Sequence, residues 1–278
     1  MIKSTKLSSI LTAAIFSALA IIIFIMILPK LFLSCASLFG FSLDKKDLYV
    51  RYILGTISRS MGILAIIYIL FKIDILRKFK FKWKMKYLLF SIIFIAYIVL
   101  NIEFKTISYD KIPLLLLMII SCLGIGIFEE VVIRGLALGL LLKAWGKSKK
   151  GIYFSVLFSS IIFGLGHIQN YLSGKADLVT TLCQVGYATF IGVMLAAILI
   201  RCDFSLWLCA ILHALFDIAS GIGDVASYGV VSKPSSIQTV NYFDELVNMS
   251  LFLPLLIFGL IFLIKVKKID ENFNVSLV

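Results

Sequence analysis

Long apolar stretches separated by short polar connections dominate this chain. A bilayer core takes about 20 apolar residues as helix, and backbone groups left unpaired there are not tolerated. Eight stretches meet or nearly meet that length: Ser8–Leu28, Tyr52–Phe71, Tyr87–Ile102, Ile112–Leu142, Ile152–Ile168, Leu178–Ile200, Phe204–Ile222 and Leu246–Ile264. The pattern predicts an all-α, polytopic membrane helical bundle of about eight transmembrane helices. No repeat or linker interrupts it, so residues 1–278 form a single integral membrane domain.

Two of these stretches depart from the expected length. The third, Tyr87–Ile102, is short. The fourth, Ile112–Leu142, would be about 46 Å long as one straight helix, whereas a bilayer core is about 30 Å thick. We expect this helix either to tilt steeply or to break near Gly124 and Gly126.

Composition removes most soluble classes. Of the 278 residues, 61% are hydrophobic and 15% charged, and the mean hydropathy is +1.07. Soluble domains are roughly 45–50% apolar and 25% charged. This excludes a water-soluble enzyme, a disordered tail or a disulfide scaffold. The five cysteines form no CxxC pair and are interpreted as small hydrophobic residues.

The basic residues point to a membrane surface. The formal net charge is +12, and Arg77–Lys86 interleaves basic residues with aromatic ones. In so apolar a chain, anionic lipid head groups are the favoured partner of this segment, and nucleic acid is not expected. Lysine and arginine favour the connections on the side of the two termini, which places both termini in the cytoplasm. The strong excess of lysine over arginine is typical of an AT-rich bacterial genome and suggests a bacterial plasma membrane.

Ionisable residues inside the predicted spans form the main functional signal, because burying them in a membrane is costly. They include both histidines of the chain. The residues are Glu129, Glu130, Arg134, His167, His213 and Asp217.

Helical spacing pairs these residues. Glu130 and Arg134 are four residues apart with the acid first, which favours an ion pair and leaves Glu129 free, about 100° around the helix. Phe163 precedes His167 by four residues, so its ring is expected to pack against the imidazole. His213 and Asp217 share the same spacing, and the carboxylate is expected to orient the imidazole or to share a ligand with it.

The connections bring these helices together. The midpoint between residues 129 and 167 falls in the polar turn 146–151. An antiparallel hairpin about that turn places Glu129 and His167 at similar heights in the membrane. His213 lies nine residues into its own span and is therefore also near mid-membrane. We expect one site.

Three motifs in this order resemble the CPBP (CAAX protease and bacteriocin-processing) family of intramembrane proteases, also called the Abi family. Glu129–Arg134 reads EExxxR, Phe163–His167 reads FxxxH, and His213–Asp217 reads HxxxN/D. The resemblance covers about residues 112–220, which would form the catalytic core. It implies an endopeptidase that cleaves a membrane-associated protein or peptide, and the bacterial features favour a peptide over a prenylated protein.

The resemblance also implies roles for the residues. Glu129 matches the general base that activates water, and His167 and His213 match two essential histidines. Glu130, Arg134 and Phe163 would support the site. Asp217 occupies a position that is Asn in the CAAX-type prenyl-protein enzymes; an ionised Asp cannot donate a hydrogen bond to an oxyanion, but it suits metal ligation or orientation of His213.

The same resemblance leaves the catalytic metal open. Two imidazoles and a carboxylate form a zinc-like set, so zinc held by His167, His213 and Asp217 is a candidate cofactor. The metal-free alternative uses Glu129 as base and the histidines to hold the oxyanion.

Other functions fit parts of the pattern. A proton-coupled transporter would also place acids and histidines in the membrane, but its usual repeated halves are missing here. A non-catalytic regulatory or immunity protein would be expected to lack motif residues. Tyr109–Asp110 and Asp224 imitate an aspartyl protease motif, but they lie in or beside polar connections. The polar loop 223–245 is expected to cover one mouth of the site.

Overall fold

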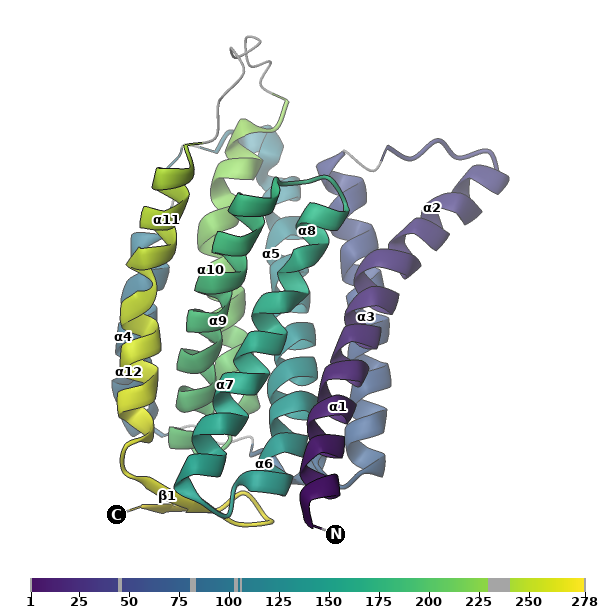
Figure 1. Cartoon of the computed structure of the whole chain (residues 1–278). Helices are drawn as coiled ribbons and strands as arrows, with labels where there is room; N and C mark the ends of the chain where they lie inside the picture. The colour runs from purple at the N-terminus through teal and green to yellow at the C-terminus, as the bar shows by residue number, and fades with distance from the viewer. Residues whose placement is uncertain are drawn as a thin grey trace.

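The computed structural model describes residues 2–44, 47–80, 84–102, 105, 107–229 and 241–277, with side chains from residue 8 onward. The helices form one elongated bundle with both termini at the same end (Figure 1). In the described part, seven helices are long and apolar enough to cross a membrane, and the shorter apolar helix Lys86–Leu100 matches the run predicted to be short. The prediction of a nearly all-helical polytopic bundle is confirmed.

The bundle contains twelve α-helices in the described residues, of which several join end to end. In chain order they are α1 (Ile2–Ile21), α2 (Leu28–Leu38), α3 (Leu48–Lys72), α4 (Lys86–Leu100), α5 (Ile112–Glu130), α6 (Gly139–Trp145), α7 (Lys149–Leu165), α8 (Gln169–Leu172), α9 (Leu178–Arg201), α10 (Leu206–Ser227), α11 (Tyr242–Leu251) and α12 (Leu253–Leu263). Two π-helical segments, Ile22–Ile27 and Val131–Leu138, join α1 to α2 and α5 to α6.

Helix α9 lies at the centre of the bundle. All of its residues from 191 to 200 are buried, which fits a helix that is covered by neighbours on every side. Helix α5 packs between α3 and α10. Gly126 sets the approach of α5 to α10, because a Cβ there would lie 2.6 Å from the carbonyl oxygen of Ala210. This close contact brings the end of α5 against the middle of α10.

The long fourth run is continuous, and its winding changes at a different place from the predicted break. Helix α5 runs without interruption through Gly124 and Gly126, so the expected break there is wrong. The winding changes instead at Val131–Leu138, where all eight residues are buried. A glycine inside a helix destabilises it by only about 1 kcal/mol relative to alanine. At Gly126 the absence of a side chain allows α10 to lie in close contact with α5.

A small β-hairpin follows the last helix and was not predicted. Strands β1 (Val266–Ile269) and β2 (Val275–Leu277) pair antiparallel. The turn between them is held by Asp270, whose side chain accepts hydrogen bonds from Asn274, and the Phe273 ring stacks on Phe204 with centroids 4.7 Å apart. The hairpin lies at the end of the bundle that also holds the N-terminus (Figure 1).

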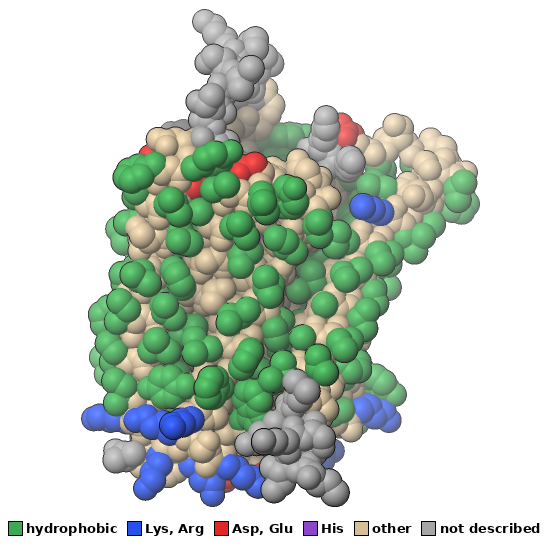
Figure 2. Space-filling view, in the orientation of Figure 1, with side chains coloured by type: hydrophobic (Ala, Val, Ile, Leu, Met, Phe, Trp, Pro, Cys, Tyr) green, Lys and Arg blue, Asp and Glu red, His purple; other side chains and the backbone are tan. Residues whose placement is uncertain are grey.

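The molecule has one basic end. Most lysine and arginine side chains in this view gather below the apolar belt, and most of the visible acidic side chains lie toward the other end (Figure 2). The predicted lipid-binding segment Arg77–Lys86 belongs to this basic end, although residues 81–83 lie outside the described part of the chain. Its contact with anionic lipid stays a prediction. Residues 230–240, the centre of the loop predicted to cover the site, also lie outside the described residues.

An ion cluster at the basic end gives a pH-dependent contribution to stability. The Asp203 carboxylate lies 2.5 Å from Lys84 Nζ and 2.9 Å from the Tyr87 hydroxyl. Burial raises the pKa of Asp203, but hydrogen bonds from Lys84 and Tyr87 outweigh it and hold the pKa below its ordinary value of 3.8.

We therefore expect Asp203→Asn to lower the free energy of unfolding by about 1–2 kcal/mol at neutral pH. A carboxyl group whose pKa is lowered by folding stabilises the folded state at pH values above its pKa in the unfolded chain. This contribution is lost as the pH falls through the pKa of the folded state. Thermal unfolding in detergent at neutral pH and at about pH 3 measures the difference. An equal effect of the substitution at both pH values would contradict the prediction.

Candidate active site

A buried ion pair anchors the site at the end of α5. Arg134 Nε lies 3.0 Å from Glu130 Oε2, and the two side chains are 1% and 0% exposed. Arg134 also donates a hydrogen bond to the carbonyl oxygen of Gly192 on α9 at 3.4 Å, and its guanidinium lies 4.7 Å from the centre of the Phe163 ring on α7. The predicted pairing is confirmed, and the arginine ties three elements together.

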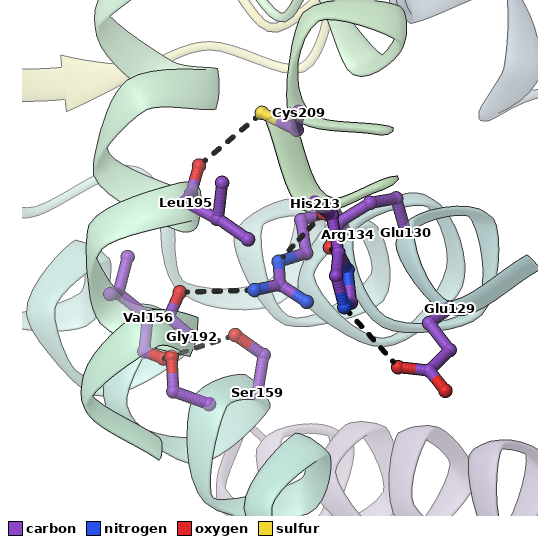
Figure 3. A network of polar contacts seen from close by, with 10 residues as sticks. Glu129, Glu130, Arg134, Val156, Ser159, Gly192, Leu195, Cys209 and His213 are labelled. Carbon is purple, nitrogen blue, oxygen red and sulfur yellow. Dashed lines mark hydrogen bonds and ion pairs between the residues drawn. The ribbon is translucent and has the colours of Figure 1, made fainter. Parts of the chain in front are cut away.

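The same glutamate holds His213. Glu130 Oε1 lies 2.9 Å from His213 Nδ1, so the two oxygens of one carboxylate bridge an arginine and a histidine. The other ring nitrogen, Nε2, faces Glu129 Oε2 at 3.7 Å and Asp217 Oδ2 at 3.9 Å. Figure 3 shows Glu129, Glu130 and Arg134 around His213. Each nitrogen of the ring therefore has a carboxylate beside it.

The carboxylates around His213 follow the sequence-based hypothesis only in part. That hypothesis pairs Glu130 with Arg134 and gives Asp217 two alternatives, to orient His213 or to share a ligand with it. In the structure the closest carboxylate to His213 is that of Glu130, while Asp217 lies near the opposite ring nitrogen, together with Glu129. Glu130 is thus placed to orient the ring, and Glu129 and Asp217 lie where chemistry at Nε2 would occur.

His167 reaches the site through an aromatic ring. It lies in the 3₁₀ turn Gly166–Ile168 that follows α7. Its imidazole packs edge-on against Phe163, with centroids 5.3 Å apart, as predicted. The His213 ring packs against the same phenylalanine at 5.6 Å. Phe163 therefore fixes the position of both imidazoles.

Two cavities have Phe163 and His167 among their lining residues. The smaller has a volume of about 30 Å³, and Glu129 and His167 are among its lining residues. A cavity needs only about 10–15 Å³ to hold a water molecule. The larger has a volume of about 710 Å³ and is lined by His167, His213 and Asp217, among others. The geometry thus places a water-sized space beside Glu129 and next to a space large enough for a peptide segment.

Arg59 is a further charged residue near the site that the sequence-based hypothesis left without a role. It lies on α3, and its buried Nε makes no hydrogen bond to the residues that the structure describes. Its charge interacts with the carboxylates of Glu129 and Asp217. The sequence could have indicated this residue, because an arginine inside a predicted membrane span is itself evidence of a functional role.

A grouped set of metal ligands does not occur among the described residues. No three His, Cys, Asp or Glu side chains there are placed to hold one ion. The two histidines instead pack on the same phenylalanine, and all five cysteines are free. The zinc set His167, His213 and Asp217 stays a prediction.

These features define the class of protein. A bundle of apolar helices encloses carboxylates and imidazoles beside a water-sized cavity, so the chain is an integral membrane protein with a buried cluster of ionisable side chains.

A family comparison agrees with this class. Residues 111–219, from the start of α5 into α10, match the family described as type II CAAX prenyl endopeptidase Rce1-like. The matched segment contains all three motifs and confirms the resemblance to the CPBP family. At family level the match supports an intramembrane endopeptidase acting on a membrane-associated peptide or protein. No curated protein matches the sequence.

Proposed function

We propose that this protein is an intramembrane endopeptidase in which Glu129 activates water to hydrolyse a peptide bond of a membrane-associated protein or peptide. The observation that carries the proposal is the water-sized cavity lined by Glu129 and His167, which shares Phe163 and His167 with the large cavity lined by His213 and Asp217. The family match over residues 111–219 supports the same reaction.

The side chains divide the reaction between them. Glu129 takes a proton from water as the oxygen attacks the carbonyl carbon, and the carbonyl oxygen becomes an oxyanion. A ring N–H of His167 stabilises that oxyanion. His213, whose Nδ1 faces Glu130, does so through Nε2 only when both of its ring nitrogens carry a proton. When the C–N bond breaks, the protonated carboxyl of Glu129 returns its proton to the leaving amine. The balance is one water consumed, with one new carboxyl and one new amine formed.

The buried ion pair of Glu130 and Arg134 positions His213 for this reaction. Glu130 occupies Nδ1 of His213 and so leaves Nε2 directed toward Glu129 and Asp217. Arg134 compensates the charge of Glu130, which a membrane interior would otherwise disfavour. Phe163 holds the two imidazoles, and Arg59 balances the negative charge of Glu129 and Asp217.

Zinc is a second form of the proposal. His167, His213 and Asp217 would hold the ion, which would lower the pKa of a bound water to about 7. The steps above use the side chains alone, because the described residues contain no grouped ligand set. Metal analysis of purified wild type and of His167→Ala separates the two forms: a stoichiometric zinc that the substitution removes establishes the metal site.

The location follows the same line of reasoning. We propose a bacterial plasma membrane, in line with the excess of lysine over arginine in the sequence. We place both termini in the cytoplasm, because the basic end carries them. Contact of Arg77–Lys86 with anionic lipid would fix this end at the interface.

Hydrolysis in ¹⁸O-labelled water tests the function. Wild type in proteoliposomes is incubated with apolar membrane-inserting peptides, and the products are examined by mass spectrometry. We expect new C-termini that carry one ¹⁸O atom, since the attacking oxygen comes from water. Uptake of a solute without any new peptide end would instead indicate transport, and failure of every tested peptide to gain a labelled end would contradict hydrolysis.

A further inference from the structure

A separate cavity lies between α3, α5 and α10. It has a volume of about 240 Å³, and the connection that follows α3 also lines it. Its lining residues include Ile67 on α3, Ile127 near the end of α5 and Leu206 at the start of α10. It shares no lining residue with the two cavities that Glu129 and His213 line. A ligand in this cavity would therefore occupy a site of its own.

The cavity adjoins the lipid-facing surface of the bundle. On α5, the exposed apolar residues Leu116, Ile120 and Leu123 follow one another at intervals of three or four residues, and Ile127 continues this stripe into the cavity. On α10, Trp207 lines the cavity and is 45% exposed. Exposed apolar side chains of membrane-spanning helices contact the acyl chains of lipids. Lipid therefore has access to this cavity from the bilayer.

A single lysine supplies charge to the cavity. Lys80 is the only charged residue among those that line it. Its backbone N–H donates a hydrogen bond to the carbonyl oxygen of Phe204 at 3.1 Å, which fixes it beside the start of α10. Asp203, the acid next to Phe204, pairs with Lys84 and Lys86 instead. Within the described part of the chain, the ammonium group of Lys80 has no carboxylate partner.

These features together fit a lipid with a negative head group. Tryptophan is enriched where a membrane meets water, and a lysine side chain reaches the head groups while its stem covers apolar surface. The connection 72–86 carries seven basic residues and one acid, Asp74. Ordered water needs two to four polar partners, which an apolar cavity does not offer. An anionic phospholipid supplies an acyl chain for the apolar walls and a phosphate for the lysine in one molecule.

We propose that this cavity is a binding site for one anionic phospholipid, whose acyl chain lies between α3, α5 and α10 and whose phosphate pairs with Lys80. The acyl chain contacts Ile127 and Val131, which flank the two glutamates of the EExxxR motif. Ile127 lies two residues from Glu129, about 200° around the helix, so the lipid packs on the face opposite the proposed base. The site does not depend on hydrolysis, and it holds whichever side of the membrane the basic end faces.

Quenching of a single tryptophan by brominated lipid tests the site. The double variant Trp83→Phe/Trp145→Phe leaves Trp207 as the remaining tryptophan of the three. It is reconstituted in phosphatidylcholine vesicles with increasing fractions of either brominated phosphatidylglycerol or brominated phosphatidylcholine. We expect the anionic lipid to bind beside Trp207 about fivefold more strongly, as for one lysine at a lipid head group. Adding Lys80→Gln should lower this ratio to about one.

A second tryptophan at the basic end supplies the matched control. The double variant Trp83→Phe/Trp207→Phe keeps Trp145, which ends α6 and does not line the cavity. We expect the ratio at Trp145 to be about one. An equal preference at Trp207 and Trp145 would indicate general attraction of anionic lipid to the basic end and would overturn the proposal. A fivefold ratio that survives Lys80→Gln would overturn it as well.

Two further variants separate the lysine from the apolar walls. Lys150→Gln removes a different charge near the same end, in the turn before α7, and should leave the ratio at Trp207 unchanged. Ile67→Phe fills part of the cavity and keeps Lys80, so we expect it to weaken the quenching of Trp207 by the anionic lipid. Quenching that is unchanged in Ile67→Phe would contradict the placement of the acyl chain.

Discussion

Glu129→Gln is expected to slow peptide-bond hydrolysis by about 10²–10⁴-fold, the contribution that a positioned general base usually makes. Glu129 borders the water-sized cavity, and its carboxylate lies 3.7 Å from His213 Nε2 with 19% of the side chain exposed. Glutamine keeps the shape of the side chain but does not take a proton from water. Single-turnover cleavage rates in proteoliposomes measure the effect, and thermal unfolding shows whether the fold is retained.

The matched control is Glu245→Gln on α11, a glutamate outside the motifs. We expect this variant to cleave at the wild-type rate. Wild-type cleavage by Glu129→Gln itself would end the proposal that this residue is the base. A slowed rate with a normal unfolding temperature would support it, because a purely structural defect lowers both.

Arg134→Met is expected to have the largest effect on stability, about 3–5 kcal/mol in the free energy of unfolding. Methionine fills much of the space but leaves the Glu130 carboxylate buried, at 0% exposure, without the charge of its arginine partner. The substitution also removes the contacts of the guanidinium with Gly192 and the Phe163 ring. Denaturant unfolding in mild detergent, followed by tryptophan fluorescence, measures the loss.

Arg51→Met provides the comparison. Arg51 pairs with Asp224 at 3.6 Å, but the two side chains are 48% and 66% exposed, so this variant should lose less than about 1 kcal/mol. Adding Glu130→Gln to Arg134→Met should recover part of the stability, since no unpaired charge then remains buried. If Arg134→Met and Arg51→Met lose equal free energies of unfolding, the buried ion pair contributes no more to stability than the exposed one.

The membrane spans were predictable because their signal is local. Each span is recognised by the length of its own apolar run. The polar turn 146–151 forms the hairpin between α6 and α7, and Ser148 caps α7. That hairpin brings Glu129 and His167 to one small cavity, as the position of the turn predicted. Helical spacing likewise predicted the contacts of Glu130 with Arg134 and of Phe163 with His167.

Contacts between distant segments were not predictable in this way. Glu130 and His213 are 83 residues apart, and their contact depends on how closely α5 approaches α10 at Gly126. Periodicity says which face of a helix is apolar but not which neighbour covers it, so the shared role of Glu130 and the nearby charge of Arg59 were missed. The hairpin β1–β2 was missed because its strands have four and three residues, too few for an alternating pattern to stand out.

The wide turns at Val131–Leu138 affect how relatives of this chain should be aligned. Arg134 lies inside them, one turn after the two glutamates of the EExxxR motif. A π-helical turn carries i→i+5 hydrogen bonds where an α-helix has i→i+4, so it accommodates an additional residue. A relative that is one residue shorter here would wind as an ordinary α-helix, so its following side chains would keep their direction while the wide turn around Arg134 would be lost. In a sequence alignment, a single-residue gap just after the glutamates would then mark a change of geometry at the site. Closing that gap to improve the alignment score would hide the change.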